Sequence, residues 1–448
     1  MGDQKREPTE ILQILLEKAK AAGADQADAV FVEGTSVSVS YRLGELESLE
    51  RSEGSDIGLR VLVGQRQACV SSADRTDEAL DELADRAVSM AKLAPADKYA
   101  GIAEPGQLAT HIPDIDCYDP SEPDIEEIKR AAMACEEAAR AVEGITNSEG
   151  ADAGWGKNRV ALAATNGFAH TYEGSHHALS VSVLAGEGVK MERDYDYRTA
   201  VYAADIPSPE SIGRTAAEKT LRRLNPQKVK TCKVPVLFDP RVAGSLIGHL
   251  TGAINGASIA RGTSFLKDKL GAKVFADGVT IVEDPHRPRG LRSKPFDAEG
   301  IANYRRNLID EGTLTTWLLD LGTARQLGLE TTGHASRGTS SPPSPSATNL
   351  HMEPGALTPE ELMREIGTGL YVTELIGFGV NGVTGDYSRG AGGFWIENGE
   401  IAFPVTELTI AGNLKDMFLN LTPANDLEFR YGTNSPTVRI DGMTVAGG

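Results

Sequence analysis

The order of hydrophobic patterns in the first half of the chain restricts the possible folds most strongly. Apolar residues recur at helical spacing over 10–22, and helical patterns return at 76–93, 124–142 and 209–221. Segments rich in β-branched residues lie between the members of each helical pair, and such segments are typical of strands. The order helix, strand meander, helix therefore occurs twice, which predicts an α+β fold.

Glycine-containing turn signals divide the segments between these helices into strands. We expect a turn at Gly34, a hairpin across Gly64-Gln65, and a further hairpin at Asn166-Gly167, the strongest turn signal of the region. The expected strands are 29–32, 36–41, 57–63, 68–71, 159–164, 168–173, 177–184 and 189–197.

The second half of the chain predicts a mixed domain dominated by antiparallel strands. Pro235 lies in the expected strand 234–238, and proline cannot donate to a ladder, so this strand is predicted to start there or to lie at an edge. A helix is expected over 241–254. Hairpins are expected at Glu311-Gly312 and Asn398-Gly399, a mobile surface loop at 336–347, and terminal strands at 427–431 and 437–440.

A chain of 448 residues is too long for one ordinary core and predicts two or three domains. The segment 94–123 is rich in Pro, Gly and Asp, which is typical of a linker. We therefore expect an N-terminal α+β domain at 1–95, a central α+β domain at 96–230 and a C-terminal domain at 231–448. The first two domains could also pack as one unit.

The net charge and the spacing of the cysteines limit the classes of protein to which this chain could belong. The formal net charge is -19, so the surface is expected to repel phosphate backbones, which disfavours direct nucleic-acid binding. The cysteines are widely spaced and predict free thiols rather than a disulfide framework. The first residues show no secretory signal, and no apolar stretch has the length of a membrane span, so we expect a cytoplasmic protein.

A search for catalytic residues finds no recognisable set. None of the eight histidines is followed by Glu, and the adjacent His176 and His177 are expected on opposite faces of a strand. The glycine-rich segment 385–393 has two interpretations, a tight connection into the strand at Phe394 or a loop lining a cleft or interface. The candidate cleft or interface residues are Arg261, His334, Asp386, Tyr387 and Arg389.

Five segments of the chain resemble the TldD/TldE family, whose TldE member is also called PmbA or modulator of DNA gyrase. They are 383–415 (VTGDYSRGAGGFWIENGEIAFPVTELTIAGNLK), 291–300, 318–333, 261–264 (RGTS) and, near the N-terminus, 58–63. The resemblance implies a heterodimeric zinc peptidase that cuts unfolded peptides in a protected chamber. It associates the family with maturation of a peptide antibiotic and with degradation of an antitoxin. In the TldD subunit, an HExxxH helix and a later Cys hold the zinc, and the Glu activates water.

Alignment on the RGTS segment places the HExxxH motif at residues 247–252 of this chain (IGHLTG). The two His positions are then Ile247 and Gly252, and the Glu position is Gly248. The region of the late Cys, 429–433, holds no cysteine. The resemblance therefore implies a TldE-type subunit without its own metal, paired with a TldD-type homologue that carries the zinc. A homodimer in isolation is a further expectation.

Two other functions stay open at this point. One is an autonomous metallohydrolase whose ligands are His249, His286 and His334, brought together by the fold. The other is a binding or regulatory protein that acts on DNA gyrase or on a toxin–antitoxin system. The acidic charge suits contact with basic protein surfaces.

Overall fold

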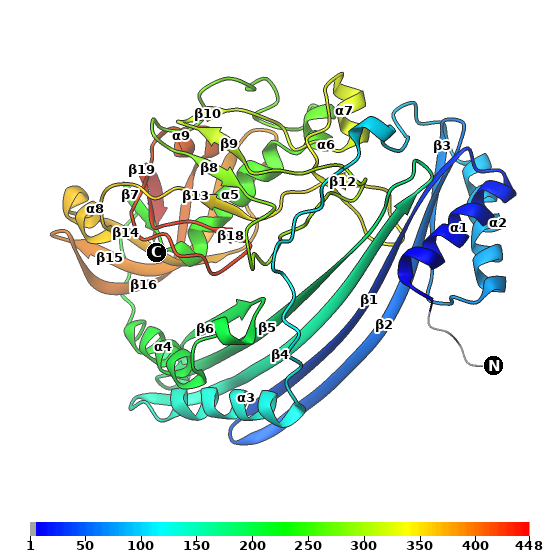
Figure 1. Cartoon of the computed structure of the whole chain (residues 1–448). Helices are drawn as coiled ribbons and strands as arrows, with labels where there is room; N and C mark the ends of the chain where they lie inside the picture. Colours follow the sequence, from blue (N-terminus) through cyan, green and yellow to red (C-terminus); the bar gives the residue numbers. More distant parts are fainter. Residues whose placement is uncertain (1–5, 448) are drawn as a thin grey trace.

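The computed structural model describes residues 6–447 and arranges them in two halves, one lying over the other (Figure 1). The N-terminal half is a long, curved antiparallel sheet with the order β3-β2-β1-β4-β5-β6. Its strands are β1 (Gln26–Arg42), β2 (Glu45–Val63), β3 (Arg66–Ser72), β4 (Ile145–Ala164), β5 (Ala169–Ala185) and β6 (Glu192–Ala200). Its helices are α1 (Pro8–Ala22), α2 (Asp77–Leu93), α3 (Ile125–Arg140) and α4 (Pro209–Arg222).

Both helical pairs cover the same face of this sheet. Side chains alternate along a strand, so odd-numbered residues of β1 share one face along its whole length. Phe31, near one end of β1, packs in a core with α1 and α2, whereas Val39, near the other end, packs in a core with α3 and α4. The first two predicted units therefore share one sheet, and the division at residue 95 into separate domains stays a prediction.

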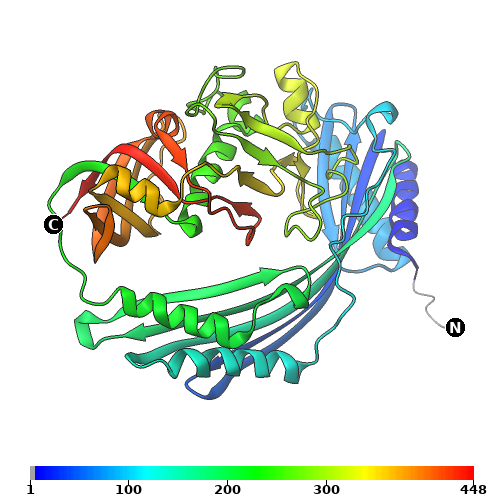
Figure 2. The same ribbon diagram turned by 60° about the vertical axis from the view of Figure 1, so that its left-hand side comes forward.

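The C-terminal half lies over the opposite, concave face of the long sheet (Figure 2). It contains two larger sheets, with the orders β16-β15-β14-β7-β19-β17 and β10-β9-β8-β13-β18. Their strands are β7 (Cys232–Phe238), β8 (Ile281–Glu283), β9 (Arg306–Asp310), β10 (Thr313–Leu314), β13 (Leu350–Met352), β14 (Gly369–Ile376), β15 (Asp386–Glu397), β16 (Glu400–Asn413), β17 (Leu421–Pro423), β18 (Thr433–Asn434) and β19 (Val438–Ala446).

One hydrophobic core joins these two sheets, and helix α5 (Pro240–Ala253) packs one face against it. The smaller elements of this half are α6 (Gly256–Ala260), α7 (Leu321–Leu327), α8 (Pro359–Ile366), α9 (Leu414–Leu419) and the paired β11 (Ala335–Ser336) and β12 (Ser344–Pro345). The fold is α+β with mainly antiparallel sheets, as the sequence predicts. No helix within residues 6–447 is long and apolar enough to cross a membrane.

The hairpin signals are confirmed, but the turn predicted at Gly34 is wrong. Gly167 and Gly399 form their turns with left-handed φ angles of 96° and 80°. Gly34 lies inside the continuous strand β1, where an added Cβ would stand 3.1 Å from the Lys157 carbonyl oxygen of β4. The chain instead reverses at Leu43-Gly44. The glycine of β1 reflects close packing of two strands and not a reversal of the chain.

Three predictions for the C-terminal half need correction. Pro235 belongs to β7, an interior strand between β14 and β19, and its backbone faces the start of β14. The pairing with β14 begins only at Val236 and Leu370, so no N–H is needed at Pro235. The glycine-rich segment 385–393 is largely strand β15 and is neither a connection nor a loop. Glycine is needed at position 393 because an added Cβ would overlap the Tyr371 carbonyl oxygen of β14. Residues 427–431 are irregular rather than a strand.

The segment 336–347, predicted to be a mobile surface loop, is anchored to the long sheet by a buried ion pair. The Arg337 side chain is 1% exposed and pairs with Asp28 of β1. Arg60 of β2 donates from Nε to the same carboxylate at 2.8 Å. Composition alone misses this anchor because the acidic partner lies more than 300 residues away in the sequence.

Candidate functional site

Helix α5, which carries the positions aligned with the HExxxH motif, begins at an Asp-Pro pair. Asp239 caps the helix, because its side chain accepts a hydrogen bond from the Arg241 N–H at 3.0 Å. Pro240 occupies the first position of the helix, where a backbone N–H would have no partner within the helix. Tyr371 of the adjacent strand β14 donates to the other Asp239 carboxylate oxygen at 2.8 Å. These contacts fix the start of the helix and therefore the direction of each side chain along it.

The three motif positions on α5 point to different surroundings. Ile247 is 0% exposed and belongs to the core between the two C-terminal sheets. Gly248 and Gly252, one turn apart, are exposed, and a Cβ added at either would meet nothing within 4 Å. The backbone thus has room for side chains at 248 and 252, while the residue at 247 faces the core.

A zinc ion does not fit the residues present on α5. An isoleucine and two glycines offer no nitrogen, sulfur or oxygen ligand from a side chain, and zinc sites need about three such ligands. Within residues 6–447, no group of three or more His, Cys, Asp or Glu side chains could hold a metal ion. The described residues therefore offer no site through which a metal-dependent step could run.

A polar cluster lies beside the glycine face of α5. The His249 ring meets the Tyr387 ring of β15 edge to face, with 5.8 Å between centroids. Burial, with a further contribution from the charge of Arg389, lowers the pKa of His249, and burial raises the pKa of Tyr387. Nε2 of His249, Oη of Tyr387 and Nε of Arg389 have no hydrogen-bond partner among the described residues. The cluster therefore combines a neutral imidazole, a phenol and a guanidinium.

The structure brings two of the five candidate residues to α5 and leaves three elsewhere. Tyr387 and Arg389 belong to the cluster just described. Arg261 is exposed at the end of α6, and Asp386 is exposed and bonds Thr384 and Asn413 locally. His334 is buried between Glu283 and Thr332, a position that stabilises the fold.

The histidines proposed as an alternative metal set lie apart. His286 Nε2 is 2.7 Å from Asn303 Oδ1, His334 bonds Glu283, and His249 contacts Tyr387. As predicted, the two adjacent histidines of β5 differ in environment, since His176 is exposed and His177 is buried. The fold therefore gives no support to a site built from His249, His286 and His334.

Residues that sequence patterns did not reveal line cavities between the two halves. Arg241 of α5 makes two bonds to Asp194 of β6, at 2.7 and 3.1 Å, and Arg223 bonds Glu374 of β14 at 2.5 Å. These pairs border a cavity of about 300 Å³ that Arg389 also lines. The paired residues lie 47 and 151 positions apart, so only the fold brings them together.

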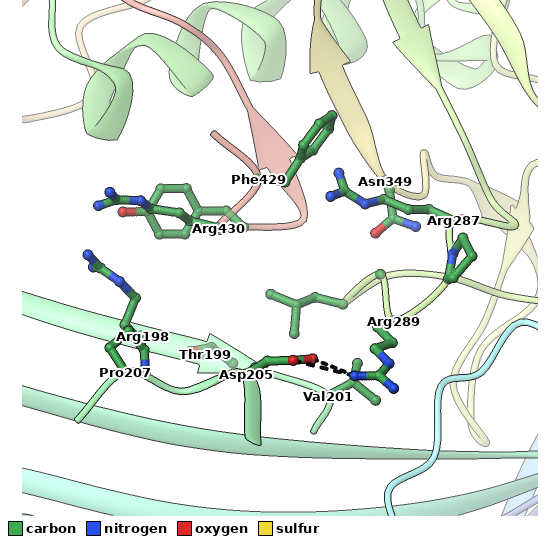
Figure 3. A pocket seen from close by; sticks show the side chains of 15 residues that line it. Arg198, Thr199, Val201, Asp205, Pro207, Arg287, Arg289, Asn349, Phe429 and Arg430 are labelled. Carbon is green, nitrogen blue, oxygen red and sulfur yellow. Dashed lines mark hydrogen bonds and ion pairs between the residues drawn. The ribbon is translucent and has the colours of Figure 1, made fainter. Parts of the chain in front are cut away.

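A second cavity, of about 320 Å³, lies further along β6 (Figure 3). It is bounded by the end of β6, the segment 287–291 and the segment 429–431. Its side chains include four arginines, Arg198, Arg287, Arg289 and Arg430. Both cavities lie where the C-terminal half faces the last strand of the long sheet.

Three domain models of one family match the chain in order. The models described as PmbA/TldA metallopeptidase domain 1, central domain and C-terminal domain cover residues 27–91, 118–224 and 231–447. The chain belongs to the PmbA/TldD family. Its α5 and β15 cluster thus lies in the metallopeptidase C-terminal domain of this family.

Curated relatives of the PmbA/TldD family match over nearly the full length. Metalloprotease PmbA of Escherichia coli O157:H7 is 42% identical over 427 residues, covering 95% of this chain and 93% of the relative. A PmbA homologue of Haemophilus influenzae is 37% identical over 446 residues, covering 99% and 97%. The chain is therefore a metallopeptidase-like protein of this family.

Solved structures of the PmbA/TldD family share the fold. A proposed modulator of DNA gyrase from Bacteroides thetaiotaomicron matches with a TM-score of 0.91 and 26% identity over 98% of both chains. TldE from Thermococcus kodakarensis matches with a TM-score of 0.87 and 21% identity, covering 98% of this chain and 100% of the other.

Proposed function

We propose that this chain is the metal-free, TldE-type subunit of a two-subunit metallopeptidase whose zinc is carried by a TldD-type homologue. The observation that carries the proposal is the set of side chains on α5. The motif positions hold a core isoleucine and two exposed glycines, none of which can bind a metal or transfer a proton. Full-length kinship to proteins named metalloproteases supports a role in proteolysis.

Unfolded peptides are the proposed substrates of the complex. The cavities beside β6, of about 300 and 320 Å³, are too small for a folded protein and suit a few residues of an extended chain. They lie between the two halves and combine charged groups with aromatic rings. In this proposal, the residues of this chain bind and orient the peptide, while the zinc-bearing subunit supplies the activated water.

The proposal is tested by purifying this chain and the HExxxH-bearing homologue from the same genome, separately and together. Zinc is measured by elemental analysis, assembly by size-exclusion chromatography with light scattering, and cleavage with a fluorogenic unfolded peptide. We expect stoichiometric zinc only in the homologue, a mixed complex, and cleavage by the mixture that far exceeds that of either chain.

The matched control is the homologue with Gln in place of the motif Glu, which should assemble normally and cleave nothing. Stoichiometric zinc together with peptide cleavage by this chain alone would overturn the proposal. A genome that encodes no HExxxH-bearing homologue would remove its main support.

A regulatory role in DNA gyrase function is the second candidate. The observation that favours it is the description of two structural neighbours, from Bacteroides thetaiotaomicron and Thermotoga maritima, as proposed modulators of DNA gyrase. Affinity capture from cell lysate separates the candidates. Recovery of gyrase subunits would favour this role, and recovery of the homologous subunit alone would count against it.

A further inference from the structure

The cavity at the end of β6 is cationic in a chain whose net charge is -19. Its charged lining consists of four arginines and a single carboxylate, that of Asp205. Figure 3 shows Arg287 and Arg289 on one side of the cavity and Arg198 and Arg430 on the other. How much of this positive charge is available to a ligand depends on the acidic partners of each arginine.

Most of these arginines already have acidic partners. The pairs are Arg289 with Asp116 at 2.9 Å and with Asp205 at 3.1 Å, Arg198 with Asp196 at 3.1 Å, and Arg430 with Glu428 at 2.6 Å. Their charges are therefore largely neutralised within the chain. Arg287 differs from them, because none of residues 6–447 forms a hydrogen bond or an ion pair with its guanidinium.

The Arg287 side chain is held in place without being neutralised. Its guanidinium carbon lies 3.3 Å from the centroid of the Phe429 ring, so one flat face is covered. Its carbonyl oxygen accepts from the Gly290 N–H at 3.0 Å and from the Ser293 hydroxyl at 2.7 Å, which fixes the backbone. Burial lowers the pKa of Arg287, against a weaker opposing effect of Asp284. A half-buried cation without a partner is costly, and a bound anion would offset that cost.

We propose that this cavity binds a carboxylate of an acidic peptide segment and that Arg287 is its main anion-binding residue. The N–H groups of a guanidinium lie in its plane, so stacking on Phe429 leaves them available for a two-bond contact with a carboxylate. The proposal rests on the proposed function, because it assumes that peptides enter the space between the two halves. It adds a preference for acidic sequences to that function.

A peptide carboxylate suits this site better than a nucleic-acid phosphate. Nucleic-acid binding requires many lysines and arginines spread along a surface, whereas the cations here are confined to one recess and three are paired with acids. The net charge of -19 of the whole chain also opposes binding of a long polyanion.

The test measures binding of fluorescein-labelled peptides to the full chain by fluorescence anisotropy. Acetyl-Ala-Ala-Ala-Glu-Ala-Ala-Ala-amide presents a side-chain carboxylate, its Gln counterpart presents none, and the Gln peptide with a free C-terminus presents a terminal one. We expect a carboxylate peptide to bind about tenfold more tightly than the neutral peptide, and Arg287→Gln to remove the difference. The two carboxylate peptides identify which source the site prefers.

Arg214→Gln, an exposed arginine on α4, is the matched control and should bind like the parent chain. Arg287→Lys should restore part of the preference, since it keeps the charge but loses the planar fork. Arg430→Gln, at a partly exposed side chain, should weaken binding less. Circular dichroism melting curves check that each variant is folded. If Arg287→Gln does not fold, the peptide preferences of Arg287→Lys and Arg430→Gln test the proposal instead.

Equal binding of acidic and neutral peptides, or an unchanged preference in Arg287→Gln, overturns this proposal. So does a single-stranded oligonucleotide or inorganic phosphate that binds at this arginine more tightly than either carboxylate peptide. The assay needs neither zinc nor the homologous subunit. A complex that assembles and cleaves peptides without any acidic preference would leave the proposed function intact and refute only this inference.

Discussion

At the scale of single residues, α5 keeps its helical form although its motif positions carry no group that binds a metal or transfers a proton. The Asp239 cap and the core contacts of Ile247 hold the helix in place. Gly248 and Gly252 then face open space with no demand for left-handed backbone angles. Glycine in such a position costs stability and gains nothing from packing.

Replacing Gly248 or Gly252 by Ala should therefore stabilise the chain. Each change is expected to raise the free energy of unfolding by about 0.5–1 kcal/mol, because alanine loses less backbone entropy in a helix. Urea unfolding followed by circular dichroism measures the effect. Gly393→Ala is the contrasting control and should destabilise, since its Cβ would overlap the Tyr371 carbonyl oxygen. A loss of stability in both helix variants would contradict the open surroundings described for α5.

Glu299 gives a prediction for pH dependence. Burial, and then the charge of Asp297, raises the pKa of Glu299 from 4.5 to about 8. Between these values the folded chain binds more protons than the unfolded chain, so the free energy of unfolding should fall as pH rises from 4.5 to about 8. Glu299→Gln should flatten this part of the profile and stabilise the chain most at the alkaline end. Urea unfolding at a series of pH values tests this prediction. It would be refuted if the free energy of unfolding fell with pH equally steeply in the parent chain and in Glu299→Gln.

The sequence predicts part of the candidate site. Alignment on the RGTS segment leads to helix α5, and two of the candidate residues, Tyr387 and Arg389, lie beside this helix. Arg241 and Arg287 could not be found this way. Each depends on a contact with a residue far away in the sequence, Asp194 for Arg241 and Phe429 for Arg287, and only the tertiary fold brings these residues together. Charge pairs between the halves leave no periodic signal in a single sequence.

At the scale of elements, local turn chemistry is predictable and strand length is not. The Asn-Gly pairs mark real hairpins because each turn needs left-handed backbone angles. Gly34 and Pro235 mislead because their explanation lies in the neighbouring strand: a close carbonyl oxygen for Gly34, and for Pro235 a partner strand whose pairing begins one residue later. Long strands such as β1 and β5 therefore appear broken in the sequence although they are continuous.

The segment between β11 and β12 provides a test at this scale. Arg337→Gln should remove the buried pair with Asp28, lower the free energy of unfolding by about 3 kcal/mol and speed amide exchange over 337–343. Hydrogen exchange with mass spectrometry measures the amide exchange rates of this segment. Arg305→Gln, which breaks an exposed pair with Glu353, is the control and should cost less than about 1 kcal/mol. Unchanged exchange in Arg337→Gln would show that other contacts hold the segment.

At the scale of the whole molecule, a few ion pairs join the two halves. Arg241→Met should leave the Asp194 carboxylate buried beside only Arg223, at 3.6 Å. We expect a loss of about 3 kcal/mol in the free energy of unfolding and faster amide exchange in β6. Adding Asp194→Asn should recover part of the loss, because the buried charge that has lost its closer partner is then removed. A double variant with the summed losses of both single variants would contradict a direct coupling.

The pairing of β1 with β4 also has a consequence for how the chain is made. Tyr41 pairs with Ala151 and Asp28 with Ala164, so the partner residues of β1 are synthesised 110 to 136 residues after their counterparts. At about 5–20 residues per second, the ribosome needs on the order of ten seconds to provide them. During that interval, the hairpin of β1 and β2 presents an open hydrogen-bonding edge with buried-type side chains such as Phe31 and Val39 beside it. The nascent chain is thus most exposed to misassociation before β4 has left the ribosome.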